Sequence, residues 1–558
     1  MLGRRDPQRS FFDAQSLPHR VADDSFYGRM GAVCDVLFRD EDLESMYCLD
    51  NGRPSLPPSL MSGVTLLQFY DDVSDREAVQ RLLYDLRWKV ALNLPLDYAG
   101  FDASSLCNFR KRLLENGQER YAFSHFITVG REAGFIPDRV TLLTDTTNVK
   151  GAGAVQDTYT LLRKGIRKLL RAVGFHLPGK QQGFSPQTQA LIERYLDRDG
   201  KADIDWADPQ QRASQLKALV ADTEAVLELA MEHDDDVEVR TIGWLLTKIL
   251  GDDVVTDEQG NPQIGKGTAP DRIISLTEPE MRHGRKSSAH RFDGFKVSVS
   301  TDESSELILD IADITAMGSD GAQLMPTIER VEAETQVVVE RAIGDGAYGS
   351  GKNRAACAEY EPEAIDLVSP LARPSDPEVH KSAFEIDLEK ETATCPRGHK
   401  IEGRAGSRRD GKPTLRFSFP RATCEACDLF ERCVQSKQAG RTVSTHPYEA
   451  HLQSGRQRQQ TEEFKTLYRL RPAVERKIAE LVSHGLRLTR YIGQPKRQLQ
   501  RLWIAAAINL KRLFTLAQVQ KVDLFRLLDH LEPPLVLSLI HISEPTRPPV
   551  ASRMPSSA

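Results

Sequence analysis

Two short runs of β-forming residues, each ending in an aspartate, constrain this chain more than any other feature of its sequence. RVTLLTD reaches Asp145, and QVVVERAIGD reaches Asp345. Val, Ile and Thr favour strands, and open α/β sheets place functional side chains at the carboxyl ends of adjacent strands. We therefore expect an α/β fold in which both carboxylates lie at one edge of a sheet.

Two carboxylates at one sheet edge can jointly hold hard divalent cations, which prefer oxygen ligands. Gly344 and Gly346 flank Asp345, and glycine lets a ligand approach the backbone closely. Taken alone, each aspartate fits equally well as a residue that ends a strand or caps a helix.

A third group comes from the segment YRLRPAVERKIAEL, in which Tyr468, Arg471 and Glu475 follow a Tyr-x2-Arg-x3-Glu spacing. Steps of three and four residues place these side chains on one face of a helix. Glu can complete a metal cage, Arg can grip phosphate through two hydrogen bonds, and Tyr can stack or hydrogen-bond. Glu480 lies off this face. The alternative is an exposed helix with ordinary Glu–Arg pairs.

The surroundings of Glu475 are basic, although the whole chain carries a net charge of −6. Residues 452–514 contain 14 Lys and Arg, including Arg497, against four Glu. Such a surplus favours a surface that faces phosphates, and a solvated helical face is the alternative.

Four of the eight cysteines form a cluster: Cys395 in CPRGH, then Cys424, Cys427 and Cys433. Thiolates at CxxC spacing suit tetrahedral zinc. The expected ligands are the four cysteines, with His399 as a substitute. The alternative is a reduced loop without metal.

The domain organisation follows from changes in hydrophobic periodicity. Residues 1–125 are expected to form a helical region, either a helix-turn-helix module that uses Arg110, Lys111 and Arg112 or a plain bundle. Ser74 and Glu77 make a capping box. The catalytic core is expected over 139–365 and 455–515, with a helical insert over about 150–285, a hairpin from 295–301 and 306–315, and one continuous helix over 464–486. The Cys-bearing insertion takes up 366–454.

Several other classes of protein are excluded by the sequence. No apolar run approaches the ~20 residues of a membrane helix, and Asp6 and Pro7 stand where a secretory signal would be apolar. We therefore expect a cytoplasmic protein. GNPQIGKGT resembles a phosphate-binding loop, but Gly267 replaces its Ser or Thr and no strand is expected before Gly260, so no nucleotide cofactor is expected. Residues 537–558 are interpreted as a non-native or disordered tail.

With these motifs in place, the chain resembles the DDE transposases of bacterial insertion sequences, in the branch with a Tyr-x2-Arg-x3-Glu-x6-Lys signature. The resemblance covers nearly the whole chain, including LLTDTTNVKGAGAV, IGDGAYGS, RPAVERKIAELVSHGLR and WIAAAINLKRLF. It implies a multidomain α/β protein with an RNase H-like catalytic core, helical and zinc-bearing insertions, and an N-terminal all-helical DNA-binding region.

The resemblance also implies roles for individual residues. Asp145, Asp345 and Glu475 would be the catalytic residues and would hold Mg²⁺ or Mn²⁺, two ions in all. Tyr468 and Arg471 would contact transposon-end DNA. The signature's Lys is replaced by Val482, so either His484 or Arg487 contacts phosphate in its place, or that contact is absent.

The implied activity is metal-dependent cleavage of DNA and strand transfer of an insertion sequence. The implied partners are the transposon terminal inverted repeats, the target DNA and a second copy of the chain in the active complex. One alternative is an RNase H-like DNA nuclease without strand transfer. Another is a catalytically inactive zinc-containing DNA-binding regulator, against which the intact acidic residues speak.

Overall fold

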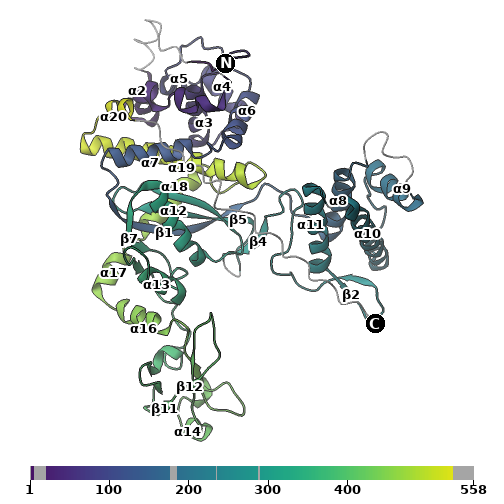
Figure 1. Cartoon of the computed structure of the whole chain (residues 1–558), viewed down its shortest axis with the longest axis vertical. Coiled ribbons are helices and arrows are strands. Elements are labelled where there is room, and N and C mark those ends of the chain that lie inside the picture. The colour runs from purple at the N-terminus through teal and green to yellow at the C-terminus, as the bar shows by residue number, and fades with distance from the viewer. Residues whose placement is uncertain are drawn as a thin grey trace.

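The computed structural model describes residues 2–4, 20–48, 50–175, 185–233, 235–286 and 289–531, so the predicted tail at 537–558 lies outside them. Figure 1 shows a central body with a helical lobe on one side and a small β-rich lobe below. The mixture of helices and several sheets confirms the α/β class. Within the described ranges, no helix is both long and apolar enough to cross a membrane.

The central sheet has six strands: β1 (Arg139–Lys150), β4 (Arg282–Arg285), β5 (Arg291–Asp302), β6 (Ile308–Thr315), β7 (Val338–Ile343) and β8 (Asp366–Val368). β5 is antiparallel to β1 on one side and to β6 and β4 on the other. β7 is parallel to β1, and β8 is parallel to β7. The order across the sheet is therefore β6–β5–β1–β7–β8, with β4 on the same edge as β6.

The predicted hairpin is confirmed by β5 and β6, which pair along their length. Its turn is held by Asp302, whose Oδ2 atom accepts hydrogen bonds from the backbone N (2.8 Å) and the Oγ (2.7 Å) of Ser305. Short polar side chains stabilise turns in this way, which explains why the polar Asp-Glu-Ser-Ser segment separates the two strands.

The expectation that the first strand ends at Asp145 is wrong. β1 continues to Lys150 because its antiparallel pairing with β5 extends to Gly294, and Asp145 pairs with Val299 inside the strand. Only the parallel pairing with β7 ends before Asp145, at Leu143. The apolar run in the sequence therefore marks the end of one of the two ladders in which β1 takes part.

Six further helices belong to the core: α12 (Leu324–Thr335), α13 (Gly351–Ala358), α17 (Glu462–Tyr468), α18 (Pro472–Ser483), α19 (Gln494–Gln520) and α20 (Leu524–His530). α18 packs on β1 and β5, α19 on β6, and α12 on β6 and β7. The single helix expected over 464–486 is wrong, because the chain breaks between α17 and α18. Pro472 lacks an N–H group and its ring clashes with the carbonyl of the preceding turn.

The N-terminal region is helical, as expected: α2 (Phe26–Leu37), α3 (Pro58–Tyr70), α4 (Asp75–Tyr84), α5 (Leu86–Ala91), α6 (Ser104–Glu115) and α7 (Tyr121–Glu132), with a 3₁₀ turn over Glu41–Met46. The Ser74 side chain caps α4 by accepting from the backbone N of Glu77. α3 and α7 pack on α19, and the buried side chains form one hydrophobic core with the sheet. The region is therefore continuous with the core rather than a separate module.

The basic triplet of this region is only partly exposed, whereas a helix-turn-helix would need an exposed surface to read DNA. Arg110 is buried and pairs with Asp75, 2.6 Å away. The guanidinium of Arg112 lies over the ring of Tyr47. Lys111 and Arg112 are both exposed, so only Arg110 is withdrawn from any DNA-reading surface, and the helix-turn-helix and the plain bundle both stay predictions.

The helical insert contains α8 (Thr158–Ala172), α9 (Pro186–Ile192), α10 (Pro209–Ala230), α11 (Val237–Asp253) and the hairpin β2 (Val254–Thr256) and β3 (Pro262–Ile264), with short irregular helices over Glu193–Asp197 and Met231–His233. It has its own hydrophobic core. The prediction that no strand precedes Gly260 is wrong, because β2 lies just before this residue. Gly260 lies in the turn of a β-hairpin rather than in a strand–loop–helix unit.

The lobe that carries the cysteines is built from short elements: β9 (Glu385–Asp387), β10 (Thr392–Thr394), β11 (Lys400–Glu402), β12 (Arg404–Ala405), β13 (Leu415–Ser418), β14 (Thr442–Ser444), α14 (Arg421–Glu425), α15 (Phe430–Cys433) and α16 (Glu449–Arg458). Its strands form two three-stranded sheets. The core is small and centres on Phe417 and Ala393. Strands of two to four residues are too short to produce a visible period, which explains the irregular sequence pattern.

Candidate active site

The register of the sheet brings the two predicted aspartates together. The parallel pairing of β1 and β7 ends with Leu143 opposite Ile343, and Asp145 and Asp345 each follow two residues later. Neighbouring strands lie about 4.8 Å apart. Asp145 on β1 and Asp345 in the loop after β7 therefore lie at the same offset from the last paired residues, and the charge of Asp345 acts on Asp145.

Asp345 lies in a loop that its neighbours hold in place. The backbone N of Ala347 donates to its Oδ1 atom (2.8 Å), and Ser369 Oγ donates to its carbonyl (2.5 Å). A Cβ atom on Gly344 would lie 2.6 Å from Cδ2 of the fully buried Tyr348 ring. Sequence reasoning missed Ser369 and Tyr348. Their positions in the sequence could have indicated them, because Ser369 directly follows strand β8 and Tyr348 lies three residues after Asp345.

Arg471 connects Glu475 to this pair of aspartates. Glu475 is in the first turn of α18, and Arg471 precedes that helix. The guanidinium donates from Nη2 to Asp145 Oδ2 (2.8 Å) and from Nη1 to Glu475 Oε1 (2.6 Å). One side chain thus contacts a carboxylate of the sheet and a carboxylate of the helix, which were predicted separately.

The electrostatics of the site reflect three acidic groups in one place. Burial raises the pKa of Asp145, and the negative charges of Asp345 and Glu475 raise it further, while Thr146 N–H and Arg471 act in the opposite direction. Burial alone would lower the pKa of Arg471, but the surrounding acids raise it. Crowded carboxylates of this kind favour a bound cation.

Two comparisons with protein families match parts of the chain. The model described as "Transposase DDE domain" matches residues 394–514, and the model described as "Transposase domain (DUF772)" matches residues 15–112. The chain is a DDE transposase. It is accordingly an enzyme that acts on DNA. The comparisons with curated proteins and with solved structures gave no match. Glu475 and Arg471 lie inside the first matched range, whereas Asp145 and Asp345 lie outside both.

The remaining predicted DNA contacts of the transposase lie around α18. Tyr468 ends α17, so the expectation that it shares one helix with Arg471 and Glu475 is wrong; its ring stacks on Phe464.

Val482, which replaces the Lys of the signature, packs against the hydrophobic core. His484 hydrogen-bonds the carbonyl of Tyr70, and its ring packs against the Tyr70 ring at a tilt. Arg487 is exposed and donates to the carbonyl of Asn148 in β1 (3.1 Å). Of the two candidate substitutes for the missing Lys, Arg487 is the more accessible.

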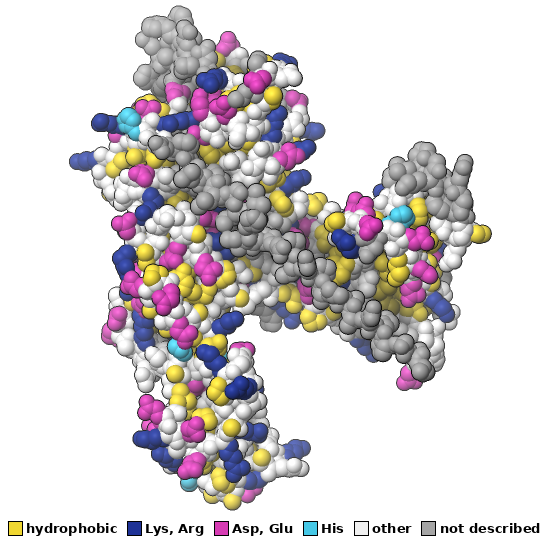
Figure 2. Space-filling view, in the orientation of Figure 1, with side chains coloured by type: hydrophobic (Ala, Val, Ile, Leu, Met, Phe, Trp, Pro, Cys, Tyr) yellow, Lys and Arg dark blue, Asp and Glu magenta, His cyan; other side chains and the backbone are white. Residues whose placement is uncertain are grey.

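The basic surplus of residues 452–514 is largely neutralised within the transposase. Ion pairs with carboxylates involve eleven of the 14 Lys and Arg: Arg456, Arg458, Lys465, Arg471, Arg476, Lys477, Arg490, Arg497, Arg501, Lys511 and Arg512. In the described part of the chain, Arg469, Arg487 and Lys496 take part in no ion pair. Figure 2 shows basic and acidic side chains intermixed on the visible face.

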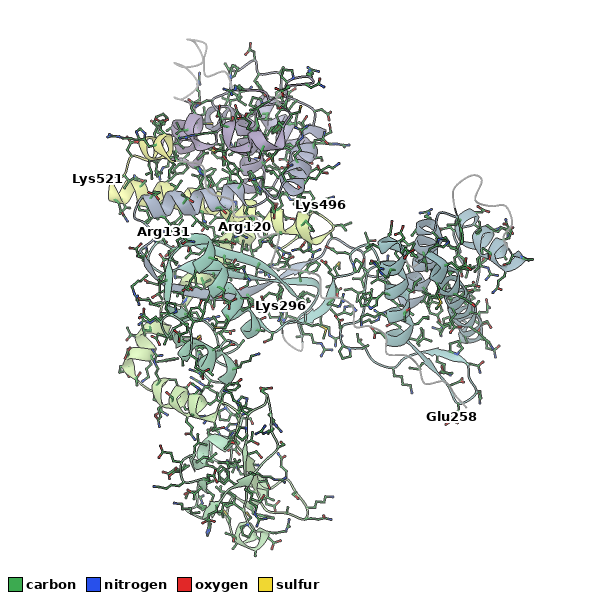
Figure 3. All side chains as sticks on the ribbon, viewed as in Figure 1. Arg120, Arg131, Glu258, Lys296, Lys496 and Lys521 are labelled. Atoms are coloured by element: carbon green, nitrogen blue, oxygen red, sulfur yellow. The ribbon has the colours of Figure 1, made fainter. Side chains whose placement is uncertain are left out.

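Arg497 had been expected on this DNA-facing surface, and that expectation is wrong. Its side chain is 2% exposed and pairs with Glu278 (2.7 Å) and Asp313 (3.3 Å), while its guanidinium stacks 3.9 Å from the centre of the Phe295 ring. The preceding residue, Lys496, is exposed and is labelled at the start of α19 in Figure 3. A charge count along the sequence cannot separate these two neighbours.

The four clustered cysteines line one small cavity of about 30 Å³, together with His399. Burial raises the pKa of Cys433, and the thiols of Cys424, Cys427 and Cys395 raise it further, against the effect of Arg441. The four cysteines predicted as zinc ligands, which belong to separate segments, therefore line the same cavity. The cavity has room for about one small ion or water.

Over the described ranges, no three Asp, Glu, His or Cys side chains are close enough together to hold a metal ion as they stand. At the acidic site, the guanidinium of Arg471 lies between two of the carboxylates. The donor set still fits a hard divalent cation, because three carboxylates supply only oxygen ligands. In the cysteine cavity, four thiols supply the soft ligands that zinc prefers.

Proposed function

We propose that Asp145, Asp345 and Glu475 form the catalytic centre of this transposase, on an RNase H-like core. In this proposal the enzyme uses Mg²⁺ or Mn²⁺, two ions in all, to cut DNA at the terminal inverted repeats of an insertion sequence. It then joins the freed ends to target DNA. The observation that carries the proposal is the contact of one guanidinium with Asp145 and Glu475, next to the strand register that aligns Asp145 with Asp345.

The sheet topology supports the RNase H-like core. β5 is antiparallel to β6 and to β1, and two parallel strands, β7 and β8, follow on the other side of β1. For such a core, the resemblance implies two aspartates from neighbouring strands and a glutamate from a helix. Asp145, Asp345 and Glu475 occupy those three positions.

The side chains at the site have separate tasks in this proposal. The three carboxylates would hold the cations, which polarise the phosphodiester and lower the pKa of the attacking water or hydroxyl. Arg471 would grip the scissile phosphate through two parallel hydrogen bonds. The carboxylates serve as ligands rather than as nucleophiles, so no covalent protein–DNA intermediate is expected. Arg487 and Tyr468 would hold the flanking DNA.

Single substitutions test the acidic cluster. Asp145→Asn, Asp345→Asn and Glu475→Gln should each abolish cleavage in Mg²⁺ or Mn²⁺, while DNA binding measured by fluorescence anisotropy stays near that of the wild type. Glu480→Gln is the matched control, since Glu480 lies on the same helix but contacts Lys477 and Lys511 instead. Normal cleavage by any of the three site variants would remove that residue from the proposed centre.

Strand transfer is tested separately from cleavage. The gene should be flanked by inverted repeats, and purified enzyme should insert a duplex that ends in that repeat into a plasmid. Cleavage without any joined product, or a gene without flanking repeats, would instead support an RNase H-like nuclease. A second copy of the chain in the active complex is proposed as well, because two transposon ends must be brought together for insertion into target DNA.

We also infer that Cys395, Cys424, Cys427 and Cys433 hold a structural zinc ion. The support is their shared cavity and the thiol-rich donor set. The cavity lies beside the small core of the β-rich lobe, against which Cys395, Cys424 and Cys433 pack as partly buried side chains. A core this small would gain much of its stability from a bound metal.

A further inference from the structure

The guanidinium of Arg471 occupies the position between Asp145 and Glu475. Its two terminal nitrogens donate to one oxygen of each carboxylate, at 2.8 and 2.6 Å. The other oxygen of Asp145 accepts from the backbone N of Thr146 (2.8 Å). Both oxygens of Asp145 therefore already have a donor, and one of the two donors carries a full positive charge.

Arg471 holds one oxygen of each carboxylate, so a divalent cation bound by Asp145 and Glu475 would compete with the guanidinium for these oxygens. A guanidinium cannot be deprotonated in a protein, so the two positive groups would also repel each other at this distance. Arg471 and the cation therefore compete for the same carboxylates. Binding of the cation by both carboxylates would therefore favour withdrawal of the guanidinium from them.

A DNA phosphate offers Arg471 an equivalent partner, because phosphate oxygens accept the same two parallel hydrogen bonds as a carboxylate. The present position also leaves one donor unused: Arg471 Nε is buried and has no hydrogen-bond partner among the described residues. An unpaired buried donor is costly. Transfer of the guanidinium to phosphate would free the carboxylates at the moment when DNA enters the site.

We propose that Arg471 couples DNA binding to metal binding, by holding Asp145 and Glu475 until a phosphate replaces them as its partner. This inference rests on the proposed function, which assigns the metal to these carboxylates. Because coupling between two ligands is reciprocal, DNA should tighten metal binding by the same factor as metal tightens DNA binding. The enzyme would then assemble its metal centre mainly on DNA.

Mn²⁺ binding to purified full-length protein tests the coupling, with free Mn²⁺ followed by electron paramagnetic resonance. Without DNA, Arg471→Ala should bind Mn²⁺ about tenfold more tightly than the wild type, because the competing charge is gone. A mixed-sequence duplex should tighten Mn²⁺ binding to the wild type by a similar factor but have little effect on Arg471→Ala. DNA binds Mn²⁺ itself, so the same titration with the duplex alone is subtracted.

Arg469→Ala is the matched control, because Arg469 is exposed and, in the described part of the chain, pairs with no carboxylate; it should behave as the wild type. Arg471→Gln, which is neutral but keeps much of the side-chain length, is measured in parallel in case Ala disturbs the start of α18. The inference is overturned if both Arg471 variants bind Mn²⁺ no more tightly than the wild type. If Asp145→Asn and Asp345→Asn also leave Mn²⁺ binding unchanged, the proposed metal centre itself is wrong.

Discussion

The loop that carries Asp345 is held by contacts to its backbone as well as to its carboxylate. Ser369 fixes the carbonyl of Asp345, and the backbone N of Ala347 fixes its Oδ1 atom. The Tyr348 ring fills the space beside Gly344, where a larger residue would not fit. The orientation of this carboxylate therefore depends on residues that have no direct part in the chemistry.

Gly344→Ala should displace the Asp345 loop, because the added methyl group meets the buried Tyr348 ring. Overpacking of this kind costs about 1–3 kcal/mol, and a shift of about 1 Å at a reacting group can reduce the rate about 100-fold. Tyr348→Phe keeps the ring and loses only the hydroxyl, so its cleavage rate should stay close to that of the wild type. Thermal unfolding and single-turnover cleavage measure both effects. Equal rates for Gly344→Ala and the wild type would contradict this account of the loop.

Arg471→Ala should slow cleavage even when the enzyme is saturated with DNA. The loss of a charge that positions the scissile phosphate is expected to cost about 100-fold or more in rate. Arg487→Ala removes an exposed charge that touches β1 only through the Asn148 carbonyl, so its effect should disappear at saturating DNA. Single-turnover rates at several DNA concentrations distinguish the two. Wild-type cleavage by fully bound Arg471→Ala would make Arg471 a docking residue only.

The residues proposed for the site could be picked out from the sequence, but their contacts could not. Asp145, Asp345 and Glu475 follow recognisable local patterns, namely two apolar runs and a spaced motif. The salt bridge between Asp145 and Arg471 joins residues that are far apart in the chain. Nothing local specifies such a contact, because it depends on how α18 packs on β1.

Among the elements, those with long-range partners were predicted least well. The hairpin β5–β6 is local, and its alternating pattern was sufficient to predict it. The continuation of β1 beyond Asp145 depends on β5, which follows the entire helical insert. The break before α18 could have been predicted, because Pro472 is visible in the sequence; the regular spacing of Tyr468, Arg471 and Glu475 concealed it.

The cysteine lobe should depend on zinc as an element of structure. Purified enzyme should contain about one zinc per chain, since four thiols complete one tetrahedral site. Cys427→Ser should release the metal and make residues 385–444 sensitive to proteolysis, because metal binding and folding are coupled. Cys48→Ser is the control, since Cys48 is an exposed cysteine outside the lobe. Elemental analysis without zinc, in protein whose lobe resists protease, would exclude the site.

At the scale of the whole molecule, the N-terminal helices and the central sheet share one core, whereas the helical insert has its own. Leu67→Ala in α3 should therefore destabilise the sheet as well, by about 2–5 kcal/mol for a buried Leu. Leu246→Ala in α11 should destabilise the insert and leave the sheet protected. Hydrogen exchange of β1 and α19 amides, measured by mass spectrometry, separates the two outcomes. Unchanged exchange of β1 in Leu67→Ala would show that the N-terminal region folds independently.

The way in which the whole molecule holds DNA depends on which charges remain available after folding. Most basic residues of 452–514 form ion pairs. The neighbours Lys496 and Arg497 are examples of an available charge and of a charge that is paired inside the protein. Lys496 is exposed and has no ion-pair partner among the described residues, whereas Arg497 is buried between Glu278 and Asp313. Only an accessible charge can release counterions from DNA when it binds.

Lys496→Ala should therefore reduce the slope of log affinity against log salt by about 0.9 if Lys496 contacts one phosphate. Arg497→Met should leave this slope unchanged and instead lower the free energy of unfolding by about 3–5 kcal/mol, because Glu278 would stay buried without its partner. Fluorescence anisotropy at several salt concentrations and chemical denaturation provide the two measurements. A smaller slope for Arg497→Met in protein of normal stability would mean that Arg497 reaches DNA and that its buried position is not kept in the complex.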